Sequence, residues 1–146
     1  MISLQQAEAI ATETLARGRE LNAAPLTVAV LDTGGHLVVL KREDDSGILR
    51  PQIATAKAWG ALGMGLSSRE LGRRAEVQPS FIAALTVLAE GRLAPAAGGV
   101  LIREPAGRLL GAVGVSGDVS DMDEACAIHA VVRAGLQPEP PTPAEQ

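Results

Sequence analysis

Aromatic residues are nearly absent from this 146-residue sequence, which contains one Trp, one Phe and no Tyr. The core that its 47% hydrophobic residues can form is therefore aliphatic. Basic residues are in the minority, with 13 Lys and Arg against 17 Asp and Glu, and they form no cluster. Proteins that bind nucleic acid use basic grooves and, for single strands, aromatic stacking platforms. The composition therefore argues against a nucleic-acid partner.

Cysteine and long apolar runs are scarce as well. The single cysteine, Cys126, excludes an internal disulfide and is consistent with a reducing compartment. No stretch approaches the ~18 consecutive apolar residues of a membrane-spanning helix. Residues 1–6 lack the basic and apolar regions of a secretory signal. We therefore expect a cytoplasmic protein without a membrane partner.

What the sequence does contain is two β-hairpin patterns. Runs rich in Val and Leu at 26–31 and 36–41 flank an Asp-Thr-Gly-Gly turn. Two further runs, at 100–104 and 109–116, flank a Pro-Ala-Gly turn. Apolar residues occupy nearly every position of the first two runs, so both faces of these strands are expected to be covered.

Helical patterns surround the hairpins. Ser3 and Gln6 form a capping box at the start of the first helix, and a second box at 67–70 begins a short polar helix. The other helices are expected over 51–64, 79–91 and 121–135, with Pro near two starts and Gly at two ends. The order α-ββ-ααα-ββ-α predicts an α/β (α+β) fold in which helices flank an antiparallel sheet.

We place a single domain at residues 1–136. Residues 137–146 include four prolines, which prevent regular hydrogen bonding, so this tail is predicted to be disordered and dispensable. Within the domain, Ala112, Gly114 and Ser116 share one face of their strand. Their small side chains are expected to let another group pack very close to the backbone.

Six stretches, in this order and spacing, resemble the GlcG/HbpS family (haem-binding-protein-like), which is also seen as the C-terminal domain of PduO-type proteins. They are Val-Ala-Val-Leu-Asp-Thr-Gly-Gly-His-Leu (28–37), Arg-Glu-Asp (42–44), Ala-Thr-Ala-Lys-Ala (54–58), Gly-Gly-Val (98–100), Gly-Ala-Val-Gly-Val-Ser-Gly (111–117) and Asp-Glu (123–124). The resemblance covers roughly residues 1–136.

The resemblance implies a profilin-like fold with an antiparallel sheet, and commonly a higher oligomer. Some members of the family bind haem, some are linked to corrinoid or diol metabolism, and many accompany genes for degrading organic acids. No common activity is established for the family, so the resemblance supplies no reaction. The family often shows Gly-Gly after its Ser-Gly, whereas Asp118 follows Gly117 here. The extra acid argues against a strongly anionic ligand.

Five charged residues form the first candidate site: Arg42, Asp44, Lys57, Asp123 and Glu124. They belong to a polar loop, the second helix and the start of the last helix, and we expect them to converge. Arg42 could then anchor a carboxylate bidentately while Lys57 or one of the acids transfers a proton. The alternative is a salt-bridge network, or dispersed surface charges that each contribute little.

Small residues form a second candidate site. Glycines let a backbone approach a ligand, and a helix N-terminus offers free N–H donors, so we count Gly98, Gly99, Ser116 and Gly117 as candidate ligand contacts. The alternative is that Ser120 caps the last helix internally and satisfies those donors.

Histidine and cysteine provide the third candidate. His36 begins a strand and could bind a ligand such as haem iron. Cys126 and His129, three residues apart on one helix face, could be half of a metal site, or packing residues only. The sequence supplies too few ligands for a complete metal site, and it shows no cofactor motif and no covalent haem motif.

These observations favour a small-molecule-binding protein of the GlcG/HbpS type, whose ligand is haem, another tetrapyrrole or an organic acid. One alternative is a cofactor-independent lyase, isomerase or hydrolase that acts on a small carboxylate with the five charged residues. A second is a structural oligomerisation module. A homo-oligomer is expected in each case. A domain this small cannot by itself cover every apolar face of its Ala- and Gly-rich helices and strands.

Overall fold

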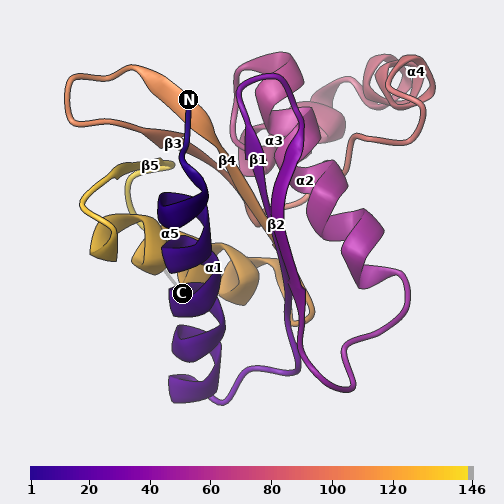
Figure 1. The fold of residues 1–146 in the computed structure, drawn as a ribbon. Coiled ribbons are helices and arrows are strands. Elements are labelled where there is room, and N and C mark those ends of the chain that lie inside the picture. The colour runs from indigo at the N-terminus through magenta and orange to yellow at the C-terminus, as the bar shows by residue number, and fades with distance from the viewer. Residues whose placement is uncertain (145–146) are drawn as a thin grey trace.

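An antiparallel sheet of five strands forms the centre of the protein (Figure 1). The computed structural model describes residues 1–144. The strands are β1 (Thr27–Asp32), β2 (Leu37–Arg42), β3 (Gly99–Arg103), β4 (Leu109–Ser116) and β5 (Gln137–Glu139), in the spatial order β2-β1-β4-β3-β5. The helices are α1 (Leu4–Glu20), α2 (Arg50–Met64), α3 (Ser68–Val77), α4 (Pro79–Leu88) and α5 (Ser120–Arg133). The predicted α/β (α+β) fold is confirmed.

Helices cover both faces of the sheet (Figure 1). α1 and α5 pack on one face against an aliphatic core that includes Val28, Val30, Val113 and Val115. On the other face α2 packs against Leu31, Leu101 and Ala112. α3 and α4 lie beyond α2, and α4 forms the outer edge of the molecule. None of the helices within residues 1–144 is long and apolar enough to cross a membrane.

The small-residue face of β4 is what allows α2 to lie so close to the sheet. A Cβ atom built on Gly114 would lie 1.9 Å from the carbonyl oxygen of Ala54 in α2. A Cβ atom on Gly99 would lie 2.3 Å from the carbonyl oxygen of Lys57. The predicted close approach is therefore real, and the group that packs there is the protein's own helix.

The start of the C-terminal segment is ordered, whereas the sequence predicted disorder from residue 137. Residues 137–139 form β5, which pairs antiparallel with β3, and Arg103 Nε lies 3.2 Å from Glu139 Oε1. β5 also packs against α5. Pro138 is tolerated because β5 is an edge strand, where one missing donor faces away from the ladder. Residues 145–146 of the predicted tail lie outside the described residues.

Candidate functional site

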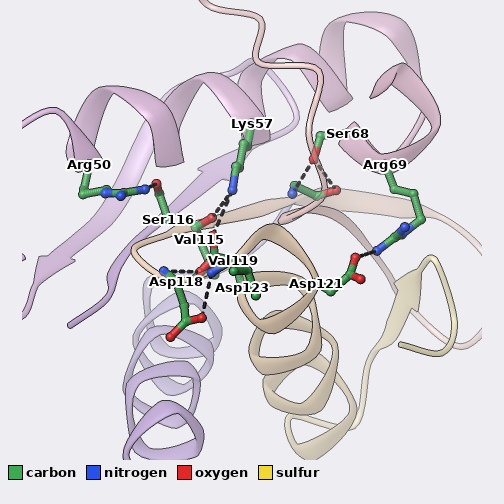
Figure 2. A network of polar contacts seen from close by, with 11 residues as sticks. Arg50, Lys57, Ser68, Arg69, Val115, Ser116, Asp118, Val119, Asp121 and Asp123 are labelled. Carbon is green, nitrogen blue, oxygen red and sulfur yellow. Dashed lines mark hydrogen bonds and ion pairs between the residues drawn. The ribbon is translucent and has the colours of Figure 1, made fainter. Parts of the chain in front are cut away.

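Lys57 and Asp123, two of the five charged residues predicted to converge, meet in the interior (Figure 2). The Nζ of Lys57 donates to the carbonyl oxygen of Val115 at 2.9 Å and to Asp123 Oδ2 at 3.1 Å. The two charged side chains are only 4% and 1% exposed. Burial lowers the pKa of Lys57 and raises the pKa of Asp123, and the charge of each partner opposes the shift of the other.

Asp123 holds a second contact that organises the start of α5. Its Oδ1 accepts from the backbone N–H of Asp118 at 2.9 Å, so one carboxylate binds both Lys57 and the turn before the helix. The expectation that Ser120 caps the helix is wrong: Val119 occupies the N-cap and makes no side-chain cap hydrogen bond. Asp123 therefore helps to fix the geometry of the turn that leads into its own helix, α5.

Glu124 lies beside this pair and binds a residue that sequence reasoning missed, Arg69. The Nε of Arg69 lies 3.0 Å from both carboxylate oxygens of Glu124, and its Nη2 donates to Asp121. The Glu124 side chain is fully buried, which raises its pKa, while Arg69 opposes that shift. The sequence feature that could have pointed to Arg69 is the capping serine Ser67. Its side chain accepts from the backbone N–H of Glu70 at the start of the helix that carries Arg69.

Arg42 and Asp44 lie apart from the buried pair. Arg42 Nη1 donates to the carbonyl oxygen of Ser46 at 2.7 Å, and both Arg42 and Asp44 are exposed. With Arg19 and Glu43 they line a surface groove of about 420 Å³. The five charged residues therefore do not form one site: two pair in the interior, one belongs to the neighbouring ion pair, and two belong to this groove.

The protein's own chain occupies the space beside the predicted ligand-binding glycines. A Cβ atom on Gly98 would lie 2.7 Å from Lys57 Nζ, and one on Gly117 would lie 2.2 Å from the carbonyl oxygen of Pro25. Ser116 is fully buried and accepts a hydrogen bond from Arg50 Nη1 at 3.0 Å (Figure 2). These residues, together with Gly99, hold α2 and the 117–119 turn against the sheet.

Histidine and cysteine are dispersed over the structure. The side chain of His36 is 81% exposed, and its Nδ1 lies 3.1 Å from Asp32 Oδ1. His129 Nε2 lies 3.2 Å from Glu13 Oε1, whereas Cys126 is in the core, where burial raises its thiol pKa to about 11. Cys126 and His129 thus pack separately. No group of three or more His, Cys, Asp and Glu residues within residues 1–144 could hold a metal ion.

A groove of about 370 Å³ lies between β2, α2 and the segment after α4. Ligand pockets are typically concave and mostly apolar, with volumes of roughly 300–1,000 Å³. This groove is therefore the best candidate for a ligand site. Its walls include apolar and polar side chains from these three segments: Leu40, Pro51, Gln52, Thr55, Ala56, Glu90, Gly91 and Arg92. We call it the α2 groove. Sequence reasoning missed it, since its walls come from three separate parts of the chain.

Arg92 is the positive group of the α2 groove. Its guanidinium carbon lies 4.0 Å from the ring centroid of Trp59, and its Nε donates to the carbonyl oxygen of Ala89 at 2.9 Å. These two contacts fix the plane of the guanidinium. Within residues 1–144, neither Nη atom of Arg92 takes part in a hydrogen bond or a salt bridge. The geometry leaves a fork of donors for a carboxylate in the wall of a mostly apolar groove.

Comparison with known proteins identifies a family model over residues 2–132, described as haem degrading protein HbpS-like. The corrinoid adenosyltransferase PduO of Citrobacter freundii is 30% identical over 138 residues, which are 93% of this chain but 40% of that protein. The chain therefore spans less than half the length of that relative. An uncharacterized 15.0 kDa protein of the same organism is 29% identical over 127 residues, covering 86% of this chain and 87% of that one.

Solved structures of similar proteins share the fold. A PduOC:heme complex superposes with a TM-score of 0.83 at 24% identity, covering 92% of this chain and 96% of that one. The protein ORFY of Klebsiella pneumoniae superposes with a TM-score of 0.80 at 25% identity, covering 92% and 90%. A double mutant of Streptomyces reticuli HbpS gives a TM-score of 0.77 at 24% identity, covering 90% and 86%.

Proposed function

The chain belongs to the family of HbpS-like haem-degrading proteins, and from that premise we propose that it binds haem or a related tetrapyrrole in the α2 groove. The observation that carries the proposal is the guanidinium fork of Arg92, whose Nη atoms make no hydrogen bond or salt bridge within residues 1–144, in the wall of a mostly apolar groove. A tetrapyrrole has the matching chemistry, because its flat apolar body carries propionate carboxylates at one edge. The family and the groove together support binding of a small molecule.

The residues of the groove fit the propionate edge of a tetrapyrrole. Leu40, Pro51 and Ala56 supply apolar walls, and Arg92 supplies a planar pair of donors that suits a carboxylate bidentately. Bound haem would supply an iron centre capable of redox and oxygen chemistry. Neither His36 nor His129 lines the groove, so this proposal assigns neither of them to the iron. In this proposal the residues of the α2 groove bind and orient the ligand by its propionate edge.

The volume of the groove favours a second candidate, a small organic acid. About 370 Å³ accommodates a whole small carboxylate but only part of a tetrapyrrole. The same Arg92 fork would hold its carboxylate. By contrast, the enzyme alternative built on Arg42 and Lys57 gains no support, because Lys57 is buried against Asp123 and Arg42 lies in a different groove.

Haemin titration of the purified protein tests the proposal, with the Soret band and the fluorescence of the single Trp59 as readouts. We expect Arg92→Ala to weaken haemin binding about 10-fold or more, because one charge-assisted hydrogen bond contributes about 1.5–3 kcal/mol. Arg108→Ala, which removes an exposed arginine on the β3–β4 hairpin, is the matched control and should bind normally. Equal binding by the Arg92→Ala and Arg108→Ala proteins would refute the assignment.

The same titration separates the two ligand classes. If the groove is built for a small acid, benzoate or octanoate should shift the thermal transition of the wild type, Arg92→Ala should lose that shift, and haemin should bind no better than these acids.

We further propose a cytoplasmic homo-oligomer. The buried lone thiol of Cys126 and the exposed apolar side chains support that assignment.

A further inference from the structure

Glu90 occupies a backbone position that favours glycine. Helix α4 ends in a Schellman motif, in which the N–H of Gly91 donates to the carbonyl oxygen of Thr86 at 2.9 Å. The N–H of Glu90 donates to the carbonyl oxygen of Val87 at 3.0 Å. The motif requires a left-handed residue at this point, and the φ of Glu90 is 55°. Glycine is usual there because it has no Cβ atom, so a glutamate at this position costs stability.

The charge of Glu90 is unfavourable at the same place. The residue follows Ala89, the C-cap of α4, and the dipole of a helix disfavours a negative side chain at this end. Its side chain is exposed, and within residues 1–144 its carboxylate accepts no hydrogen bond and forms no salt bridge. Sequences that fold well break such local rules mainly at functional sites. Glu90 breaks two of them without a compensating contact in the described chain.

Glu90 and Arg92 both belong to the wall of the α2 groove, and the other residues that line this groove within residues 1–144 are neutral. No ion pair joins the two in the described structure, although only Gly91 separates them along the chain. Arg92 instead stacks on Trp59 and donates its Nε to the carbonyl oxygen of Ala89. One acid and one base therefore line the same groove, and neither has an ionic partner there.

A ligand that complements this wall carries one charge of each sign. While Arg92 holds its carboxylate, Glu90 can accept hydrogen bonds from an ammonium group of the same molecule. A second carboxylate in that place would meet Glu90 with the same charge, and such a contact selects against a ligand. This inference rests on the carboxylate site proposed at Arg92. We propose that Glu90 makes the α2 groove selective for small amino-carboxylates.

The same residue affects the binding of a tetrapyrrole. Haem carries two propionates and no ammonium group, so Glu90 finds no cation to bind and repels the propionate that Arg92 does not hold. Removing the charge of Glu90 should therefore raise the affinity for haemin and lower the affinity for an amino acid. Opposite shifts identify a residue that sets specificity, because damage to the groove would weaken the binding of every ligand.

Calorimetric titration of the full chain with three matched acids tests the proposal. Phenylalanine, 3-phenylpropionate and benzylsuccinate share a phenyl ring and a carboxylate. The first adds an ammonium group, the second adds nothing, and the third adds another carboxylate. We expect the wild type to bind phenylalanine most tightly and benzylsuccinate least tightly. Glu90→Gln should weaken phenylalanine about 5-fold, strengthen benzylsuccinate by a similar factor and leave 3-phenylpropionate unchanged, because an ion pair at an exposed carboxylate contributes up to about that factor.

Two further variants separate specificity from folding. Glu76→Gln removes the same charge from an exposed position on α3, outside the groove, and should leave all three affinities unchanged. Glu90→Gly should lose the preference for phenylalanine and yet raise the melting temperature, because glycine suits the left-handed backbone. A lower melting temperature for Glu90→Gly would instead assign Glu90 to the fold.

The outcomes also separate this inference from the proposed function. If Arg92→Ala weakens every acid while Glu90→Gln changes no preference, the carboxylate site at Arg92 stands and the selectivity assigned to Glu90 is wrong. If none of the three acids binds the wild type, or if Arg92→Ala binds them all normally, both the selectivity and the small-acid candidate are wrong.

Discussion

At the scale of single residues, Lys57 and Asp123 form a buried ion pair whose desolvation is costly. Both side chains are almost fully removed from water, and each depends on the other for compensation. The remaining hydrogen bonds, from Lys57 to the Val115 carbonyl and from the Asp118 N–H to Asp123, satisfy further polar atoms. The pair therefore connects α2, the end of β4 and the start of α5 at one point. We interpret it as a structural connection, because both side chains are out of reach of a ligand.

Replacing one member of the pair should be costly and dependent on pH. We expect Asp123→Asn to lower the free energy of unfolding by about 3 kcal/mol at pH 7, because it leaves a buried ammonium without its counter-charge. The folded-state pKa of Lys57 is already below 10.5, and loss of Asp123 lowers it further. Folded protein then binds fewer protons than unfolded protein, so stability should rise as the pH increases from the folded-state pKa towards 10.5. Urea unfolding at pH 7 and pH 9.5 measures this recovery.

Two further variants make the result specific. Asp44→Asn, at an exposed position, should show neither the loss nor the recovery. Lys57→Met combined with Asp123→Asn removes the unpaired cation and should regain part of the lost stability at pH 7. If Asp123→Asn were as stable as Asp44→Asn at pH 7, the buried pair would not have the importance assigned to it.

At the scale of elements, the contact between α2 and β4 decides the fold. Gly114 and Ala112 face α2, and Ala54, Ala58 and Ala61 are the buried residues of the helix on that side. Small side chains on both elements bring the backbones together, so the van der Waals contact is made largely by main-chain atoms. The α2 groove lies between the same helix, β2 and the segment after α4, so its shape depends on how α2 packs on the sheet.

Adding one methyl group at this contact should displace the helix. We expect Gly114→Ala to destabilise the protein by about 3 kcal/mol, since the new Cβ would lie 1.9 Å from a backbone oxygen that cannot rotate away. Gly47→Ala is the matched control, because its Cβ would meet side-chain atoms of Arg50 no closer than 3.7 Å. Thermal unfolding followed by circular dichroism compares the two variants. A Gly114→Ala protein with the melting temperature of Gly47→Ala would show that α2 moves away freely.

At the scale of the whole molecule, the C-terminal segment closes the structure. β5 pairs with the edge of β3 and packs against α5, so one segment contacts both the sheet and a helix. Covering the β3 edge removes a row of unpaired backbone groups that could otherwise recruit another strand.

Truncation separates the contributions of this segment. We expect a chain that ends at Leu136 to lose about 1–2 kcal/mol of stability, because the β3 edge and the Arg103–Glu139 ion pair are both lost. A chain that ends at Pro140 keeps β5 and should lose less. Chemical denaturation of the two truncated proteins beside the full chain measures both effects. Identical stability of all three would restore the view that the segment is dispensable.

The sequence by itself determined the five helices, the first four strands and their order along the chain. The capping box at Ser3 and Gln6, the two hairpin turns and the small-residue face of β4 depend on neighbours a few positions apart, and such local patterns can be interpreted without a structure. The resemblance that rests on the same stretches predicted the family. β5 was missed because its three residues pair with a strand 36 positions away and a proline obscures the pattern.

Only the tertiary structure decided which charges meet. Lys57 lies 66 positions from Asp123, and Arg69 lies 55 positions from Glu124. No local pattern distinguishes these pairs from Arg42 or Asp44, which remain in water. The α2 groove likewise joins Leu40, Pro51 and Arg92 from three segments. Such pairings follow from how α2 and α5 pack around one sheet, because burial and distance, rather than residue type, determine which ionisable groups interact.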